Sequence, residues 1–252
     1  MEIRTRLVNY MKELGDKDLC VAFSGGVDSS VILRAACEAA AVNGKKVYAV
    51  TFETKLHPKA DLPQAQKVAK EAGAIHHVIY VNELDNEEML NNPVNRCYLC
   101  KKYLFQNLLT FAAEKGIDTI MEGNNADDLL IYRPGTQAVK ELGVLSPLAE
   151  LGITKAQVRE IAADMGHVYA FNNLGKIYEA RNDLKLAFDY YMKSANLGDS
   201  WAQNRVGEFY RLGKIGNINL QKAFDYYTLS SESPKFTLCN WAKYNLAKYF
   251  YK

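Results

Sequence analysis

Hydrophobic side chains in residues 2–14 recur every three or four positions, which predicts an amphipathic helix that ends at Gly15. Beyond this segment, short apolar runs alternate with further helical patterns. The helical patterns predict one helix that ends near Asn43, and others at 61–72 and 98–115. The apolar runs predict strands at 19–23, 47–52, 77–81, 117–122 and 144–148.

The predicted strands are nearly continuous apolar runs rather than alternating ones. Strands of that kind are buried on both faces, and helices between consecutive strands favour parallel pairing. We therefore predict a doubly wound α/β domain with a parallel sheet covered on both sides. A ligand site in such a domain is expected at the carboxyl ends of the strands.

The strand signals stop after Gly166, and a repeated helical pattern begins. Residues 169–178 recur as 201–210 and more weakly as 241–250, while residues 187–191 recur as 223–227. Periods of this size with two helices per period predict an all-α helical repeat, or solenoid, module. We expect its aromatic side chains to fill the spaces between helices rather than to stack on nucleic acid.

The composition changes at the same place. Of the 252 residues, 1–166 contain 10 aromatic side chains and 167–252 contain 18, including both tryptophans. The first part carries 19 basic and 22 acidic residues, whereas the second carries 12 and 7. We therefore predict two domains, 1–166 and 167–252.

Composition also excludes several classes of protein. No run of about 18 apolar residues occurs, so we expect no membrane-spanning helix. The interleaved charges of residues 1–4 do not resemble a secretory signal. Five scattered cysteines are no disulfide framework, which favours a cytoplasmic protein. The net charge of +2 gives no argument for nucleic acid binding.

Residues 24–30, with the sequence S-G-G-V-D-S-S, lie between a predicted strand and a predicted helix. Glycines allow the backbone to approach a ligand, and the helix N-terminus directs N–H groups at it. These features and the serine hydroxyls suit phosphate oxygens, although a plain turn with a helix cap is the alternative. The residues predicted to bind the nucleotide are Ala22, Phe23, Ser24, Gly25, Gly26, Asp28, Ser29, Ser30, Phe52 and Asn124.

This loop resembles the S-G-G-x-D-S pyrophosphate loop of the PP-loop ATP pyrophosphatases. That family includes GMP and NAD synthetases, argininosuccinate and asparagine synthetases, and tRNA thiolation enzymes. The resemblance implies an adenine nucleotide alpha hydrolase-like fold, with ATP as cofactor. It also implies cleavage of ATP between the α- and β-phosphates and adenylation of a substrate.

Four further motifs, at 92–101, 122–128, 132–135 and 145–148, follow in the order seen in LarE-type ATP-dependent sacrificial sulfur transferases. The resemblance covers residues 1–166. It implies ATP-dependent activation of the carboxylates of a pyridinium dinucleotide, followed by sulfur insertion for a nickel-pincer cofactor. The segment that carries that family's sulfur-donor cysteine has no counterpart after Gly166, where only Cys239 occurs.

Charged residues in these motifs are the candidate catalytic and metal-binding groups. Asp127 and Asp128 follow a predicted strand and could hold Mg²⁺ on phosphate oxygens, although a solvated acidic turn is the alternative. With Asp28, the arginines Arg96 and Arg133 are predicted catalytic residues that could pair with phosphate or a substrate carboxylate. Each arginine alone could equally be a surface residue.

Cys97 and Cys100 form a C-x-x-C pair at the start of the helix predicted at 98–115. A zinc site would need a second pair of ligands, which the sequence does not offer at suitable spacing. Redox-active thiols and plain structural cysteines are the other interpretations, and the sequence does not decide between them.

Residues 167–252 resemble Sel1-like repeats of the tetratricopeptide superfamily over about two and a half units. Such a short array is expected to dock on the α/β domain or on another subunit, giving a possible homo-oligomer, and its repeats could also bind a protein partner. Two alternatives to the sulfur-transferase hypothesis stay open. The chain could be another PP-loop ligase or tRNA thiolation enzyme, or a nucleotide-binding interaction protein without catalysis.

Overall fold

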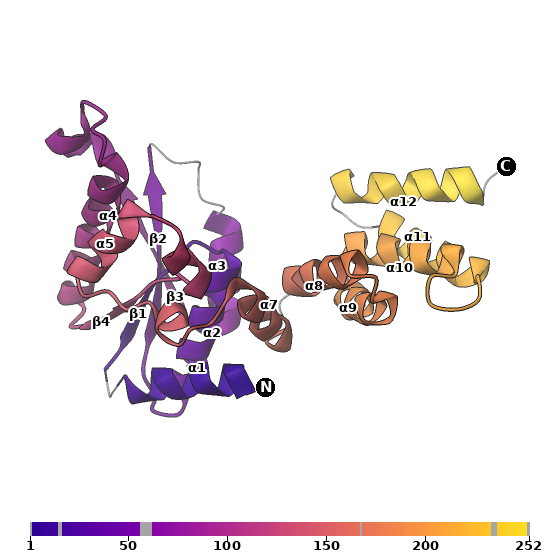
Figure 1. Ribbon diagram of the computed structural model, residues 1–252, viewed down its shortest axis with the longest axis horizontal. Coiled ribbons are helices and arrows are strands. Elements are labelled where there is room, and N and C mark those ends of the chain that lie inside the picture. The colour runs from indigo at the N-terminus through magenta and orange to yellow at the C-terminus, as the bar shows by residue number, and fades with distance from the viewer. Residues whose placement is uncertain (1, 15–16, 56–61, 167, 233–235, 251–252) are drawn as a thin grey trace. The chain divides into compact units, whose positions relative to one another are not determined.

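The computed structural model describes residues 2–14, 17–55, 62–166, 168–232 and 236–250. The chain forms two compact units, Met1–Met165 and Gly166–Lys252 (Figure 1). No helix within the described ranges is both long and apolar enough to cross a membrane.

The first unit is built on a parallel sheet of four strands in the order β3-β2-β1-β4. The strands are β1 (Leu19–Ala22), β2 (Val47–Thr54), β3 (Ile75–Val81) and β4 (Thr119–Met121). This sheet confirms the predicted parallel α/β architecture. Since β2 and β3 extend to one side of β1 and β4 pairs on its other side, the strand order reverses between β1 and β4. The loops that follow these two strands therefore flank a crevice, the usual ligand site of such sheets.

Helices cover both faces of the sheet (Figure 1). On one face, α4 (Arg96–Glu114) and α5 (Pro134–Glu141) pack together, and Phe105, Leu108 and Phe111 of α4 join the sheet core. On the other face, α2 packs against three further helices. These helices are α1 (Glu2–Glu13), α2 (Val27–Ala41), α3 (Leu62–Ala72) and α7 (Lys155–Asp164). The remaining short helices are η1 (Glu83–Asp85), η2 (Glu87–Met89), η3 (Ala126–Leu130) and α6 (Pro147–Glu150).

Two strand predictions need correction. The strand expected at 144–148 is reduced to a single bridge between Met121 and Leu145, because Pro147 lacks an N–H and begins α6. The strand β3 is not buried on both faces: it is a sheet edge, and Tyr80 on it is 76% exposed. Its apolar residues therefore did not indicate a central position in the sheet.

The second unit consists of helices in which each packs against the next. They are α8 (Val168–Ala180), α9 (Leu184–Asn196), α10 (Ser200–Leu212), α11 (Leu220–Ser231) and α12 (Phe236–Tyr249). Asp183, Asp199 and Asn219 begin α9, α10 and α11 by accepting a backbone N–H with the side chain, as N-cap residues do. The unit is therefore all-helical, while its membership of the Sel1-like repeats stays a prediction.

Two glycine–tyrosine contacts hold consecutive helices of this unit close together. The fully buried ring of Tyr191 on α9 lies over Gly175 of α8, and that of Tyr227 on α11 lies over Gly207 of α10. A Cβ atom at Gly175 would lie only 2.3 Å from the Tyr191 ring. The sequence repeat at 175 and 207 therefore reflects a steric requirement for glycine. Many aromatic side chains fill the core as expected, but Trp241 does not, because it is 67% exposed.

A charged cluster lies beside the first of these contacts. Arg205 and Lys214 both pair with the Glu179 carboxylate, which also accepts the hydroxyl of Tyr191 at 2.9 Å. Burial alone would raise the pKa of Glu179, but the hydrogen bonds from Lys214, Arg205 and Tyr191 outweigh it and lower that pKa. The carboxylate of Glu179 on α8 is thus neutralised by one cation from α10 and one from the segment after α10.

We expect Gly175→Ala to lower the free energy of unfolding of the second unit by about 1–3 kcal/mol, because its Cβ would overlap the Tyr191 ring. Urea unfolding followed by tryptophan fluorescence measures this change, since Trp201 and Trp241 both lie in that unit. Asn173→Ala, on an exposed position of the same helix, is the control. Equal urea midpoints for the two variants would contradict the steric account.

Candidate active site

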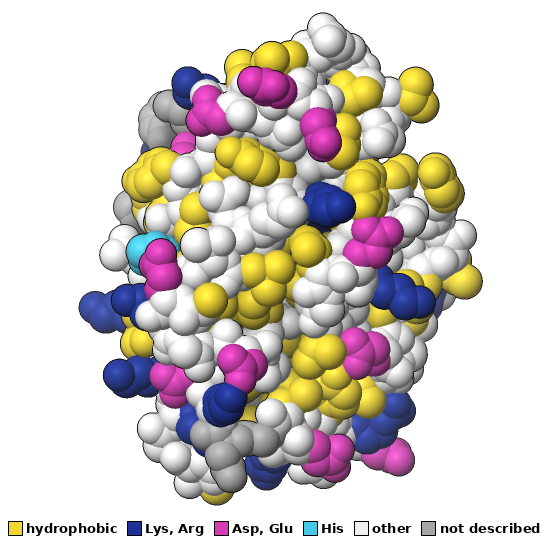
Figure 2. Space-filling model, turned by 90° about the vertical axis from the view of Figure 1, so that its left-hand side faces the viewer, with side chains coloured by type: hydrophobic (Ala, Val, Ile, Leu, Met, Phe, Trp, Pro, Cys, Tyr) yellow, Lys and Arg dark blue, Asp and Glu magenta, His cyan; other side chains and the backbone are white. Residues whose placement is uncertain are grey.

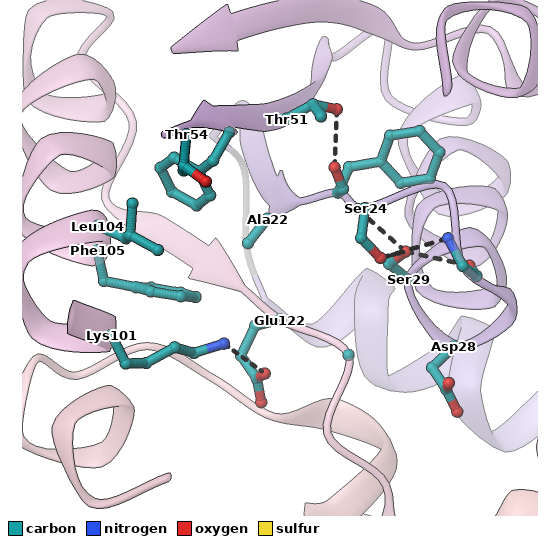
Figure 3. A pocket seen from close by; sticks show the side chains of 14 residues that line it. Ala22, Ser24, Asp28, Ser29, Thr51, Thr54, Lys101, Leu104, Phe105 and Glu122 are labelled. Carbon is teal, nitrogen blue, oxygen red and sulfur yellow. Dashed lines mark hydrogen bonds and ion pairs between the residues drawn. The ribbon is translucent and has the colours of Figure 1, made fainter. Parts of the chain in front are cut away.

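A pocket of about 470 Å³ lies at the carboxyl ends of β1, β2 and β4 (Figure 3). Its walls come from the loop between β1 and α2, the end of β2, helix α4 and the loop after β4. The lining residues are Ala22, Phe23, Ser24, Gly26, Asp28, Ser29, Thr51, Phe52, Thr54, Lys101, Leu104, Phe105, Glu122 and Gly123. Most of the predicted nucleotide-binding residues are thereby brought together.

The loop between β1 and α2 is closed by its own serine hydroxyls. Gly25 adopts a left-handed φ of 76°, a conformation that favours glycine. The Ser24 hydroxyl accepts the Gly26 N–H at 3.3 Å and lies 3.2 Å from the Ser29 hydroxyl. Since Ser29 is in the first turn of α2, the hydroxyls and the helix N-terminus lie at the same end of the pocket.

Three predicted nucleotide-binding residues do not line the pocket. The backbone of Gly25 turns toward Ala65 of α3, and the side chain of Ser30 is buried under the loop. Asn124 follows Glu122 and donates its backbone N–H to that carboxylate at 3.1 Å. These residues therefore lie beside the pocket and shape the loops around it.

Apolar side chains form the opposite wall of the pocket. Phe52 at the end of β2 and Phe105 of α4 have ring centroids 6.0 Å apart, and Ala22 and Leu104 lie beside them. The Thr51 hydroxyl donates to the Phe23 carbonyl at 2.7 Å and so joins β2 to the end of β1. The pocket thus has an apolar end and a polar end.

A buried carboxylate, Glu122, lies between these two ends (Figure 3). The side chain is only 4% exposed, and the Ser146 hydroxyl donates to it at 2.6 Å. The Lys101 ammonium lies 4.0 Å from this carboxylate and 4.6 Å from the centroid of the Phe105 ring. Burial raises the pKa of Glu122, although Lys101 and Ser146 partly oppose this rise. Sequence reasoning missed Lys101 as a pocket residue, because only the packing of α4 shows which of its faces lines the pocket.

Asp28 at the polar end is paired with a lysine from a distant part of the chain. The Lys155 ammonium forms an ion pair with the Asp28 carboxylate, and the Asn125 amide donates to the same carboxylate at 3.3 Å. Lys155 begins α7, directly after the Thr154 cap, and its backbone N–H donates to Asp127 at 2.9 Å. The sequence signal that could have found this lysine is its position in the first turn of a clearly capped helix.

The carboxylates predicted to bind Mg²⁺ are engaged in local contacts outside the pocket lining. Asp128 accepts the backbone N–H of Asn125 at 3.0 Å and pairs with Arg133 at 2.8 Å. Asp127 accepts the backbone N–H of Lys155. Arg96 donates to the Asn92 side chain at 3.0 Å and does not line the pocket either. Across the described ranges, no group of three or more His, Cys, Asp and Glu side chains is arranged to hold a metal ion.

The cysteine pair lies at the start of α4. Cys97 is exposed and Cys100 is buried, and both are free thiols. Burial, and secondarily the charge of Glu83, raises the pKa of Cys100. Redox-active thiols and structural cysteines both stay predictions for this pair.

Two curated relatives match the first part of the chain. An uncharacterized protein of Synechocystis, slr1717, is 39% identical over 165 residues, which cover 65% of this chain and 60% of that protein. The pyridinium-3,5-bisthiocarboxylic acid mononucleotide synthase of Lactiplantibacillus plantarum is 31% identical over 163 residues, which cover 65% and 58%. The match thus spans about three fifths of the length of these relatives.

Solved structures share the fold at low sequence identity. NMN synthetase from Francisella tularensis has a TM-score of 0.52 and 17% identity, with 65% of this chain and 69% of that chain covered. The NH₃-dependent NAD synthetase of Campylobacter jejuni has a TM-score of 0.51 and 16% identity, with 86% and 98% covered. At these identities the likeness concerns the fold alone.

The family match includes every strand of the sheet and all of the pocket residues. Residues 4–174, more than half of the chain, match the family described as asparagine synthase. The chain therefore belongs to the asparagine synthase family, with a PP-loop domain as its first unit.

Proposed function

We propose that the first unit binds ATP in this pocket and adenylates the carboxylate of a small-molecule substrate, as an enzyme of the sacrificial sulfur transferase type. The observation that carries the proposal is the S-G-G-V-D-S-S loop, whose hydroxyls and helix N-terminus face a pocket with an apolar wall. Donors for phosphate and a surface for a base thus lie at opposite ends of one pocket. The named relative from Lactiplantibacillus plantarum supports the sulfur-transferase type.

The two ends of the pocket set the orientation of the nucleotide. The triphosphate would lie along Ser24, Gly26 and Ser29, because N–H groups at a helix N-terminus and hydroxyls donate to anionic oxygens. The adenine would lie against Phe52 and Phe105, since aromatic side chains bury a flat base favourably. In this orientation the α-phosphate faces the middle of the pocket, beside Glu122.

Lys155 would stabilise the charge of the departing pyrophosphate. Its ammonium pairs with Asp28, which lines the polar end of the pocket, and the pair is part-buried, so its electrostatic effect is stronger than in water. The lysine could exchange its contact with Asp28 for a phosphate oxygen without moving α7. We therefore add Lys155 to the predicted residues Asp28, Arg96 and Arg133.

Magnesium bound together with the nucleotide would neutralise part of the negative charge of the phosphates. Asp28 lines the pocket and could contribute a carboxylate oxygen, the kind of ligand that Mg²⁺ prefers. The predicted ligands Asp127 and Asp128 do not line the pocket, and Asp128 is paired with Arg133. Asp28 is accordingly the carboxylate whose present position fits best.

The substrate carboxylate would enter beside Lys101. This ammonium lines the pocket next to the position proposed for the α-phosphate, and it is shared between the Phe105 ring and Glu122. An incoming carboxylate could therefore gain a cation while Glu122 keeps its hydrogen bonds from Ser146 and Asn124. A carboxylated pyridinium nucleotide fits this requirement and the name of the relative from Lactiplantibacillus plantarum.

A large basic footprint for nucleic acid is not visible on the face of the molecule in Figure 2. There, Lys and Arg side chains are interspersed with Asp and Glu and with hydrophobic side chains. Recognition of tRNA depends strongly on clustered positive charge. This face thus gives the tRNA thiolation alternative no support.

We expect the purified protein to release pyrophosphate from ATP and Mg²⁺ when nicotinic acid adenine dinucleotide is present, and Asp28→Ala to lower the rate about 100-fold. A coupled assay for pyrophosphate measures both rates. Nucleotide binding in equilibrium dialysis, with no pyrophosphate released from ATP in the presence of any carboxylate substrate, would favour the non-catalytic alternative instead.

We expect Ser29→Ala and Lys155→Ala each to weaken ATP binding about tenfold or more, because a hydrogen bond to a charged group contributes about 1.5–3 kcal/mol. Lys155→Arg should keep part of the affinity, since it keeps the positive charge. Isothermal titration measures the affinities, and circular dichroism verifies the fold. Lys140→Ala, which removes an exposed charge on α5, is the control and should bind ATP like the wild type.

We expect Glu122→Gln to gain stability over the wild type as pH rises from about 4.3, the ordinary pKa of glutamate, toward 7. Because burial raises the pKa of Glu122 on folding, the wild type loses this contribution as the carboxyl ionises. Urea unfolding across this pH range measures the difference. Glu141→Gln is the control: because the Tyr98 hydrogen bond lowers the pKa of Glu141, its stability relative to the wild type changes mainly below about pH 4.3 and stays nearly constant from there toward 7. Parallel stability curves for the wild type and Glu122→Gln would contradict this account.

A further inference from the structure

A histidine on the edge strand of the sheet contacts a side chain of the pocket. The Nε2 atom of His76 on β3 lies 2.9 Å from the hydroxyl oxygen of Thr51 on β2. Thr51 is buried and lines the pocket, and it donates its hydroxyl to the Phe23 carbonyl at 2.7 Å, the dashed line drawn from Thr51 in Figure 3. His76 thus reaches the end of β1 through one side chain of β2.

The hydrogen-bonding capacity of the three groups fixes where their protons lie. A carbonyl oxygen only accepts, so the single proton of the Thr51 hydroxyl is used in its bond to Phe23. The Thr51 oxygen can then only accept at its contact with His76, and Nε2 of His76 therefore carries a proton. The three groups form a directed chain of hydrogen bonds from His76 through Thr51 to Phe23, which we call the His76 relay.

The register of the sheet positions His76 for this contact. His76 is paired with Ala49, two positions before Thr51 on β2, so the side chains of His76 and Thr51 lie on the same face. The next residue, His77, points to the opposite face, where its ring stacks against α4. The His76 ring also meets the Phe23 ring edge to face, with centroids 6.3 Å apart. The imidazole is therefore held by an apolar contact as well as by its hydrogen bond.

The His76 imidazole is neutral at neutral pH. Burial, and secondarily the charge of His77, lowers the pKa of His76 below its ordinary range. A neutral imidazole has only one N–H, and either ring nitrogen can carry it. The contact with Thr51 assigns this proton to Nε2.

The relay holds the peptide group at the entrance of the phosphate-type loop. The Phe23 N–H donates to the Val50 carbonyl at 2.7 Å, and the Phe23 carbonyl accepts the Thr51 hydroxyl. Across a trans peptide bond, the C=O of one residue and the N–H of the next point in opposite directions. Because the Phe23 carbonyl points at Thr51, the Ser24 N–H is turned the other way, and there it donates to the Ser29 hydroxyl at 3.4 Å.

The direction of the Ser24 N–H matters for an anion at the polar end of the pocket. Its 3.4 Å contact with Ser29 is at the long end of hydrogen bonds, and an anionic oxygen is a stronger acceptor than a hydroxyl. Ser24 and Ser29 both line the pocket. A peptide turned by half a rotation would instead direct the Phe23 carbonyl oxygen at this place, and its negative end would repel a phosphate.

We propose that His76 and Thr51 are positioning residues that hold the peptide between Phe23 and Ser24, so that the Ser24 N–H faces the phosphates of the bound nucleotide. The inference rests on the function proposed above and deepens it, because it names what orients a phosphate-binding N–H. His76 lies outside the pocket lining and acts only through Thr51. The relay should therefore affect phosphate binding and leave binding of the base unchanged.

Thr51→Val tests this separation, because valine has nearly the shape of threonine but leaves the Phe23 carbonyl without its donor. We expect the variant to bind ATP about tenfold more weakly in isothermal titrations and to bind adenosine, followed by ligand-observed NMR, within about twofold of the wild type. Thr51→Ser restores the hydroxyl and should bind ATP within about threefold of the wild type. An equal loss of ATP and adenosine affinity in Thr51→Val would show a general distortion of the pocket and would overturn the proposal.

A double-mutant cycle tests the part played by His76. His76→Phe keeps a ring beside Phe23 but removes the donor, and we expect it to weaken ATP binding about threefold in the wild-type background. In the Thr51→Val background it should have almost no further effect, since the relay is already broken there. His77→Phe, a substitution of the adjacent histidine on the opposite face, is the matched control and should bind ATP like the wild type. Additive losses from His76→Phe and Thr51→Val would contradict the relay.

Nitrogen-15 NMR of the histidine rings tests the relay without a nucleotide. We expect the signals that disappear in His76→Phe to show a protonated Nε2 at neutral pH, and a proton on Nδ1 alone would overturn the relay. The titrations also separate this inference from the proposed function. If the wild type binds no ATP, the proposed function fails as well. If the wild type binds ATP and Thr51→Val binds it equally well, only the present inference fails.

Discussion

The close approach of two loops at Gly123 is the constraint on which the candidate site depends. A side chain there would place its Cβ 3.1 Å from the Ser29 backbone nitrogen and 3.4 Å from the Cβ of Asp28. Because a Cβ at this position would press on the backbone of the first turn of α2, glycine lets the loop after β4 lie directly against that turn without a shift. This contact holds the two sides of the strand-order reversal together, and it places Glu122 and Asp28 in one pocket.

Each charge around the pocket has a partner from a distant segment. Asp28 is paired with Lys155, and Glu122 is paired with Lys101 while it accepts the Ser146 hydroxyl. Pairing and hydrogen bonding offset part of the cost of removing these charged groups from water near an apolar wall. They also place two cations at or beside the pocket, Lys101 in its lining and Lys155 on the carboxylate of Asp28.

Several elements could be predicted because their signals are local. The apolar run of β1, the glycines after it and the helix of α2 follow one another within a short segment, so the phosphate-type loop was evident from residues 19–36. The edge position of β3 was not evident, because an apolar run does not say how many neighbours a strand has. The sequence also did not show that the strand predicted at 144–148 is reduced to one bridge, since Pro147 could either begin a helix or follow a strand.

The order of residues specified the parallel α/β fold, the glycine loop and the glycine–tyrosine spacing of the helical unit, because each depends on residues within one turn or one repeat. The folded chain alone decided which side chains meet at the pocket. Lys155 reaches Asp28 across 127 positions, and Lys101 faces Glu122 only because α4 packs on the sheet with that side inward. Likewise, Trp241 and Trp201 occupy equivalent positions in the sequence, but Trp241 is far more exposed, because Trp201 packs against the Tyr191 ring of α9 and the Lys176 ammonium of α8.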